Sequence, residues 1–283
     1  MPASDISLPV TLAVLGAGLL HATWNAMLKS ARGEPLLETA LICAGSSVVA
    51  GVFAPFVPFP PAVAWPYMIA SAAIHFAYYI TLAGAYRRGD LSFAYPLMRG
   101  VAPLIVTLLG VLFLGEHLKP GSLAGIALIS AGILVIAWFA GGRHTPAAAG
   151  WALANAAIIA CYTLVDGAGT RISGNAASYI VWLVFLEGFP FLLWILATRG
   201  RPAVDHVVAG RRRGIAAGAA SLGSYGIALW AMTQAPIAVV AALREVSVVF
   251  AAAIGALVLK EGFGWRRMLG AASVVLGVAA LKF

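Results

Sequence analysis

The sequence predicts an all-α membrane protein of ten transmembrane helices, arranged as two inverted five-helix repeats. The chain of 283 residues is 62% hydrophobic and only 10% charged, with a mean hydropathy of +0.96, whereas a soluble domain carries roughly a quarter charged residues. Apolar stretches near 20 residues long recur along it. Because lipid satisfies no backbone polar groups, stretches of this length favour helices.

Each expected span is about as long as a helix must be to cross the hydrocarbon core. In the first half the spans cover 8–28, 37–58, 65–86, 91–114 and 121–140, and in the second half 147–168, 176–198, 214–234, 236–259 and 264–282. Short connections rich in glycine, proline or charge separate them. The longest connection, 199–213, is too short to form a domain, so we divide the chain into repeats at 1–142 and 143–283.

An internal duplication supports this division. Residues 91–136 align with 236–281 at a shift of 145 residues without a gap, and the alignment pairs Arg99 with Arg244, Glu116 with Glu261, Gly125 with Gly270 and Gly132 with Gly277. Each half has an odd number of spans, so the second half is expected to be upside down relative to the first. Inverted repeats of this kind are typical of secondary transporters, which handle substrate near the midplane where the halves meet.

Several function classes are excluded by composition and motifs. The net charge of +8 comes from basic residues in short loops, where they set orientation, so we expect no nucleic-acid partner. Cys43 and Cys161 lie in apolar segments and are interpreted as small buried hydrophobes. No phosphate loop, nucleophile elbow or metal-ligand cluster is present, so we expect no enzyme, cofactor or metal site.

The loop charges also predict an orientation. Most basic residues lie in the loops that follow the odd-numbered spans, which places those loops in the cytoplasm and both termini outside. Lys29 is the first basic residue, so no charged region of a cleavable signal peptide precedes the first span.

Spans 4 and 9 each end in an apolar stretch, a glutamate and a short turn, in Val111–Glu116 and Ala256–Glu261. With ten spans in two halves, this pattern resembles the EamA branch of the drug/metabolite transporter superfamily over essentially the whole chain. The resemblance implies export of amino acids, drugs or other metabolites, peripheral spans 5 and 10, and cytoplasmic termini, opposite to the charge rule. The strings His21–Asn25 and Tyr95–Gly100 are similar to a subgroup associated with phosphonate metabolism.

The duplicated arginines are the first candidate site residues. Arg99 and Arg244 each lie about eight residues into an apolar span, where an arginine costs roughly 2.5–3.5 kcal/mol on insertion scales. A guanidinium facing the cavity would offer a planar fork to a carboxylate or phosphonate. Alternatively, each arginine pairs with an internal acid or helix-end carbonyls, and Glu245 is the candidate partner of Arg99.

Three acidic residues in the spans are candidates for proton coupling: Glu187, Glu245 and Asp166. Glu187 lies in the middle of span 7, beside Gly188 and Pro190, which could interrupt the helix. The alternatives are a neutral Glu187 hydrogen-bonded to a neighbouring helix and an Asp166 located in the membrane interface.

A polar and aromatic set shares helix faces. His21, Trp24 and Asn25 occupy positions i, i+3 and i+4, and His75, Tyr78 and Tyr79 repeat this spacing. Tyr95 adds to the set, and Asn155, Tyr162, Tyr225, Trp230 and Gln234 are weaker candidates from the second half. Such stripes either line a binding cavity or form hydrogen bonds and aromatic contacts between helices.

These observations predict a secondary transporter that moves a small metabolite across the inner (plasma) membrane by alternating access, as an exporter. The cavity is expected between spans 1, 3 and 4 and spans 6, 8 and 9. The arginines favour an amino acid or another carboxylate- or phosphonate-bearing compound. The alternatives are an exporter of drugs or other xenobiotics, a flippase-like handler of lipid-linked substrates, and a non-transporting assembly subunit. Beyond the substrate and the lipid bilayer, the expected partner is at most a second copy, as monomer or homodimer.

Overall fold

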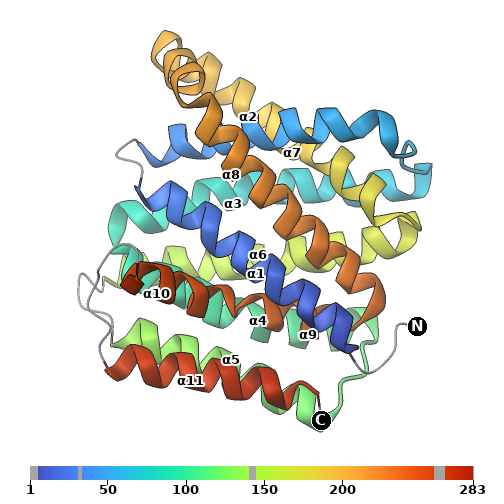
Figure 1. Ribbon diagram of the computed structural model, residues 1–283, viewed down its shortest axis with the longest axis vertical. Coiled ribbons are helices and arrows are strands. Elements are labelled where there is room, and N and C mark those ends of the chain that lie inside the picture. The colour runs from blue at the N-terminus through green and yellow to red at the C-terminus, as the bar shows by residue number, and fades with distance from the viewer. Residues whose placement is uncertain (1–5, 31–33, 140–144, 258–264, 283) are drawn as a thin grey trace.

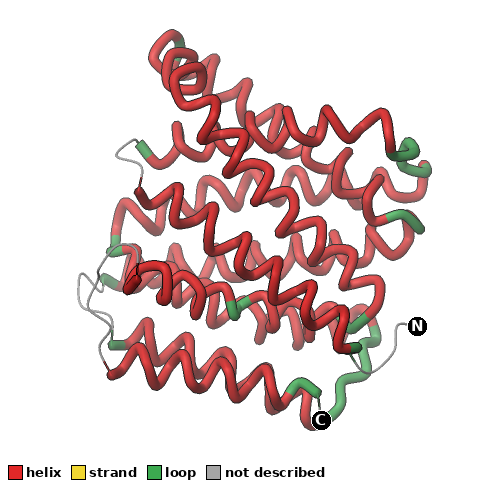
Figure 2. Tube along the Cα trace, viewed as in Figure 1, coloured by secondary structure: helices red, strands yellow, loops and turns green. Residues whose placement is uncertain are grey.

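The computed structural model describes residues 6–30, 34–139, 145–257 and 265–282. In these ranges the chain consists of helices and the loops that join them (Figure 2). The helices are α1 (Leu8–Ser30), α2 (Pro35–Phe53), α3 (Trp65–Arg88), α4 (Leu91–Leu114), α5 (Pro120–Trp138), α6 (Pro146–Ser173), α7 (Ala176–Arg199), α8 (Arg201–Gln234), α9 (Ile237–Arg244), α10 (Ser247–Leu257) and α11 (Trp265–Ala280), with short 3-10 turns η1 (Ala54–Phe56) and η2 (Ala62–Ala64).

Eight of the described helices, α1 to α8, are long and apolar enough to cross a membrane, and a shorter apolar stretch covers Met268–Ala280 in α11. The expectation of a single helix over 236–259 is wrong, because α9 ends at Arg244 and α10 begins at Ser247. Between them the backbone closes tighter turns: the amide of Glu245 bonds to Ala242 and that of Val246 to Leu243. In a continuous helix consecutive side chains point about 100° apart. The break lets the neighbouring Arg244 and Glu245 both lie buried, at 8% and 4% exposure.

The longest connection of the sequence is also helical. Gly200, with φ of 61°, ends α7, and α8 begins at the next residue with proline in its first turn. At 34 residues this helix is about 50 Å long at 1.5 Å per residue, more than the roughly 30 Å of a hydrocarbon core. The beginning of α8 lies at the top of Figure 1. This part of the helix carries Arg201, Arg211, Arg212 and Arg213. The basic residues placed in a loop by the sequence therefore lie on a helix.

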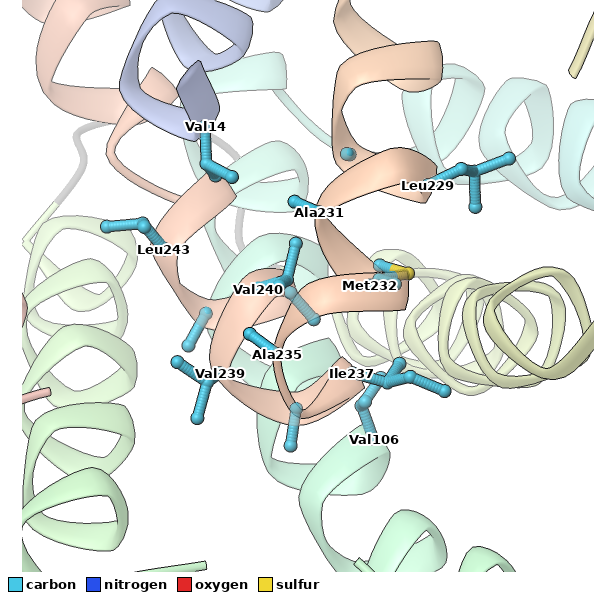
Figure 3. Packing of buried hydrophobic residues seen from close by; sticks show 14 of the residues in the cluster. Val14, Val106, Leu229, Ala231, Met232, Ala235, Ile237, Val239, Val240 and Leu243 are labelled. Carbon is cyan, nitrogen blue, oxygen red and sulfur yellow. The ribbon is translucent and has the colours of Figure 1, made fainter. Parts of the chain in front are cut away.

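The helices pack as a bundle in which each half supplies neighbours to the other (Figure 1). Helix α1 contacts α8, α9 and α10, and α6 contacts α3 and α4. The short α9 is buried along its whole length. Figure 3 shows its apolar side chains within the main core, which includes Val14, Val106, Leu229, Met232, Ile237, Val239, Val240 and Leu243. Helices of both halves thus enclose α9 at the centre of the molecule.

Helices α5 and α11 pack against each other at the bottom of Figure 1, and α5 also packs against α4. Four glycines lie where the two backbones approach most closely. A Cβ on Gly125 would lie 2.7 Å from the Gly277 carbonyl oxygen, and one on Gly132 would lie 2.7 Å from that of Gly270. Because the earlier glycine of one helix faces the later glycine of the other, α5 and α11 are antiparallel. In the duplication Gly125 corresponds to Gly270 and Gly132 to Gly277. Each glycine of α5 therefore contacts the glycine that corresponds to the other one.

We expect Gly132→Ala to destabilise the protein by about 1–3 kcal/mol, because overpacking a close contact forces the backbones apart. The matched control is Gly150→Ala on α6, where a Cβ meets nothing within 4 Å. That change should be neutral or slightly stabilising, since alanine favours helix more than glycine does. Thermal unfolding of both variants in detergent measures the difference. Equal melting temperatures would contradict the close packing of α5 and α11.

Candidate functional site

A cavity lined by polar and aromatic side chains lies inside the bundle, with a volume of about 140 Å³. Side chains from α1 to α4 and α6 to α9 line it, so α2 and α7 contribute in addition to the six spans expected from the sequence, and α5 and α11 do not. All nine residues predicted to bind substrate lie on its wall: His21, Trp24, Asn25, His75, Tyr78, Tyr79, Tyr95, Arg99 and Arg244.

The helical spacing of the polar residues explains why they meet here. On α1 the rings of His21 and Trp24 contact edge to face at 5.0 Å, and the Asn25 amide donates to the His21 carbonyl oxygen at 2.8 Å. On α3 the rings of Tyr78 and Tyr79 lie 5.4 Å apart. Both triplets occupy one face of their helix, as residues at i, i+3 and i+4 must.

The second half completes an aromatic wall. Tyr162 stacks on His75 at 4.2 Å between ring centroids, and Tyr225 meets the His75 ring at 6.1 Å. Asn155 also lines the cavity and donates to the Tyr78 carbonyl oxygen at 3.1 Å. The other two weaker candidates, Trp230 and Gln234, are not on the cavity wall, and Trp230 is exposed.

Several wall residues were missed by the sequence interpretation. Tyr86 follows Tyr78 and Leu82 at intervals of four on α3, so the helical period alone would have placed it on this face. Cys43 lines the cavity and its thiol contacts the Tyr79 hydroxyl at 3.7 Å, which gives it a polar neighbour. Cys161 is exposed, so its interpretation as a buried residue is wrong: it lies on the outer face of α6. Thr39, Ser46 and Ser221 carried no sequence signal beyond polarity.

Arg99 is neutralised within the protein. Its Nε lies 2.7 Å from Glu245 Oε2, and both side chains are buried. The arginine comes from the middle of α4, between Pro96 and Pro103, and the glutamate from the break after α9. Glu245, a candidate for proton coupling, is therefore an ion-pair partner across the two halves, and the pairing proposed from the sequence is observed.

Arg244 has a different environment from its duplicate. Its guanidinium carbon lies 5.1 Å above the Tyr225 ring, a cation–π contact. In the described part of the chain no carboxylate forms an ion pair with it. The side chain is 92% buried and lines the cavity. A buried cation without a carboxylate partner is costly in a membrane, so this guanidinium is available to an anion in the cavity.

Asp166 is fully buried, next to the tyrosines of the cavity wall. Its two carboxylate oxygens accept hydrogen bonds from the hydroxyls of Tyr179, at 3.0 Å, and Tyr225. Because the same Tyr225 ring lies under Arg244, the carboxylate and the guanidinium are joined through one side chain. The negative charge of Asp166 thus lies near, but not on, the free arginine.

Glu187 is on the wall, across from α3. Its Oε2 lies 3.2 Å from His75 Nδ1. The same nitrogen lies 3.0 Å from the Ser71 carbonyl oxygen and 3.1 Å from the Ser71 hydroxyl. This contact brings α7 and α3 together at the cavity, where a carboxyl and an imidazole line the same space, but Glu187 Oε2 accepts no hydrogen bond from the described residues.

Glu116, from the motif that ends span 4, caps the beginning of α9. Gly115 ends α4 in the left-handed conformation, with φ of 62°. The carboxylate of Glu116 then accepts from the amides of Ile237, at 2.6 Å, and Ala238, at 3.1 Å, and pairs with Arg171 at 3.2 Å. A carboxylate at a helix N-terminus satisfies free amides and opposes the helix dipole. The matching Glu261 lies outside the described residues.

No group of three or more histidine, cysteine or acidic side chains in the described ranges is arranged to hold a metal ion. The polar groups on the wall are instead single donors and acceptors spread among aromatic rings. Such a wall suits a small organic molecule with one or two polar ends.

These features define a multi-pass α-helical membrane protein whose bundle encloses a polar, aromatic cavity. The chain belongs to the EamA-like transporter family, a family of membrane transporters, because the family's sequence profile matches residues 8–138 and 146–283. The resemblance seen in the sequence is thereby confirmed. A solved structure, titled only as the crystal structure of a protein, has a TM-score of 0.74 and 20% identity, over 96% of each chain. That likeness concerns the fold.

We expect Arg99→Met to destabilise the protein by about 3–5 kcal/mol, because it leaves Glu245 as a buried charge without a partner. The double variant Arg99→Met/Glu245→Met removes both charges and should recover most of the loss. Thermal unfolding in detergent compares them with Arg212→Met, which removes an exposed guanidinium. A single variant as stable as Arg212→Met would show that the ion pair does not form.

We expect Glu116→Ala to cost about 1–3 kcal/mol, because two amides of α9 lose their acceptor in a buried place. The matched control is Glu34→Ala, which removes an exposed glutamate paired with Arg199 at 2.6 Å. Exposed pairs of this kind contribute less than about 1 kcal/mol. If both variants unfold at the same temperature, the capping role of Glu116 is wrong.

Proposed function

We propose that this protein is a secondary transporter that moves a small anion-bearing metabolite, an amino acid or another carboxylate or phosphonate, through the central cavity by alternating access. The observation that carries the proposal is Arg244. Its guanidinium is buried on the cavity wall and lacks a carboxylate partner among the described residues, whereas the guanidinium of Arg99 is paired. A planar guanidinium binds carboxylate and phosphonate groups through two parallel hydrogen bonds.

The aromatic wall supports a partly apolar substrate. The ring centroids of Tyr78, Tyr162 and Tyr225 lie 6.3, 4.2 and 6.1 Å from that of His75. Aromatic faces and edges pack well against flat or apolar groups. In this proposal the anionic end of the metabolite binds at Arg244 and its body lies along these rings.

An inverted repeat would supply the alternating access. The antiparallel pair α5 and α11, with duplicated glycines meeting crosswise, is the packing expected of two repeats related by a two-fold axis in the membrane plane. The first helix of each half also packs against helices of the other half. Helix α1 contacts α8, α9 and α10, and helix α6 contacts α3 and α4. Rocking of one half against the other would open the cavity to each face in turn.

Uptake into liposomes reconstituted with the full chain tests this proposal. The panel contains radiolabelled amino acids, phosphonates and cationic drugs. Arg244→Ala should lower uptake of the carboxylate or phosphonate compounds about 10- to 100-fold, because a hydrogen-bonded charge pair contributes about 1.5–3 kcal/mol. The matched control, Arg212→Ala, removes an exposed guanidinium of α8 and should keep uptake near that of the unsubstituted protein.

Two outcomes would overturn the proposal. Unchanged uptake by a folded Arg244→Ala protein would show that this arginine does not bind the substrate. Uptake restricted to cationic drugs would favour a drug exporter, in which the paired and unpaired arginines have only structural roles.

A further inference from the structure

A carboxyl–imidazole pair in the cavity wall has no part in anion binding by Arg244. Glu187 and His75 come from different helices, α7 and α3, and their side chains are only 12% and 9% exposed. They are 3.2 Å apart, close enough for a shared proton. Both groups can gain or lose a proton, so the pair can hold different charges within one geometry.

Neutral groups contact the pair and keep it in place. Ser71 contacts the His75 nitrogen, and Tyr162 stacks on the imidazole ring. The titratable groups around the pair include Cys43 from α2, Tyr78 and Tyr79 from α3, Asp166 and Tyr162 from α6, and Tyr225 from α8, and the charged Arg244 of α9 lines the same cavity. Among these only Asp166 and the pair itself titrate in an acidic to neutral range in water.

The pair is connected to the free arginine through Tyr225. The ring of Tyr225 meets the His75 ring at 6.1 Å and lies under the Arg244 guanidinium at 5.1 Å. Its hydroxyl donates to Asp166. An anion bound at Arg244 is therefore separated from the Glu187–His75 pair by the side chains of Arg244 and Tyr225. In these buried surroundings charges interact more strongly than in water.

The backbone beside Glu187 is also suited to movement. Pro190 lies inside α7 and lacks an amide, so the Leu186 carbonyl has no helical donor at that position. Prolines inside helices are common sites of bending. A change in the contact between Glu187 and His75 would thus act on a helix that is weakened at the same turn.

Charge balance in the buried wall gives the sign of the coupling. The positive charges of Arg99 and Arg244 are balanced by Glu245 and Asp166 when the Glu187–His75 pair carries no net charge. An anion on Arg244 leaves one uncompensated negative charge, which is costly in a membrane interior. One additional proton on the pair removes it.

We propose that the Glu187–His75 pair is a proton-binding site, and that one proton from the solvent binds it each time an anion binds Arg244. This inference rests on the proposed function for its anion site. The proton adds to the imidazole nitrogen or the carboxylate oxygen, and no other bond is made or broken. Proton and anion then move in the same direction, so an inward proton gradient favours uptake, and export requires an excess of the anion inside.

Infrared difference spectroscopy of the full chain in lipid nanodiscs tests the proton site without a substrate. Between pH 5 and 9 the protein should show a protonated-carboxyl band that is absent from Glu187→Gln. The matched control is Asp205→Asn, which removes an exposed carboxyl whose side chain is 65% exposed; the band should remain. A folded Glu187→Gln protein that keeps the whole band would overturn the proton site.

Binding of benzenesulfonate tests the coupling, because this anion keeps one charge at every pH used. Trp24 on the cavity wall provides a fluorescence signal. Affinity should rise at least tenfold from pH 9 to pH 5 in the unsubstituted protein and should not vary with pH in Glu187→Gln. His75→Phe keeps the stack on Tyr162, removes the imidazole, and is expected to lose most of the pH dependence.

The two proposals fail in different ways. If benzenesulfonate binds with the same affinity at every pH, and Arg244→Ala abolishes that binding, the coupling is wrong and the anion site stands. If the Glu187 band titrates while neither benzenesulfonate nor any compound of the transport panel interacts with the protein, the proposed function fails and so does the coupling.

Discussion

The ion pair between Arg99 and Glu245 is the interaction on which the centre of this protein depends. It joins the middle of α4 to the break that follows α9. Lipid satisfies no backbone polar groups, so a break in a membrane span is tolerated only where protein surrounds it. The break places the carboxylate of Glu245 inside the protein, and Arg99 neutralises it. The ion pair also holds the Arg99 side chain in place on the cavity wall.

The other end of α9 is held in a related way. Glu116 lies two residues after the end of α4 and accepts from the first amides of α9, while Arg99 within α4 pairs with Glu245, the residue that follows α9. One helix of the first half therefore holds both ends of a short, fully buried helix of the second half. These contacts therefore tie α9 of the second half to the α4 region of the first half at both of its ends.

Much of this arrangement followed from the sequence because it depends on local periodicity. The spacing of His21, Trp24 and Asn25, repeated on α3, placed two polar faces correctly, since a helix fixes the direction of each side chain. The break at Glu245 and the helical state of 201–213 did not follow. Hydropathy cannot distinguish a broken buried span from a continuous one. It also gives no sign that the charged segment at the beginning of α8 packs on α2 through contacts such as Arg213 with Glu38.

The unequal roles of the two arginines come from a single difference between the repeats. The duplication places Gly100 in the first half where the second half has Glu245. A two-fold relation between the halves would pair Arg244 with residue 100, as it pairs Arg99 with residue 245, but glycine offers no carboxylate. A side chain at this position would also collide with Leu134, because its Cβ would lie 2.9 Å from the leucine Cγ. Close packing of α4 against α5 thus excludes an acid there, and Arg244 has no carboxylate ion-pair partner among the described residues.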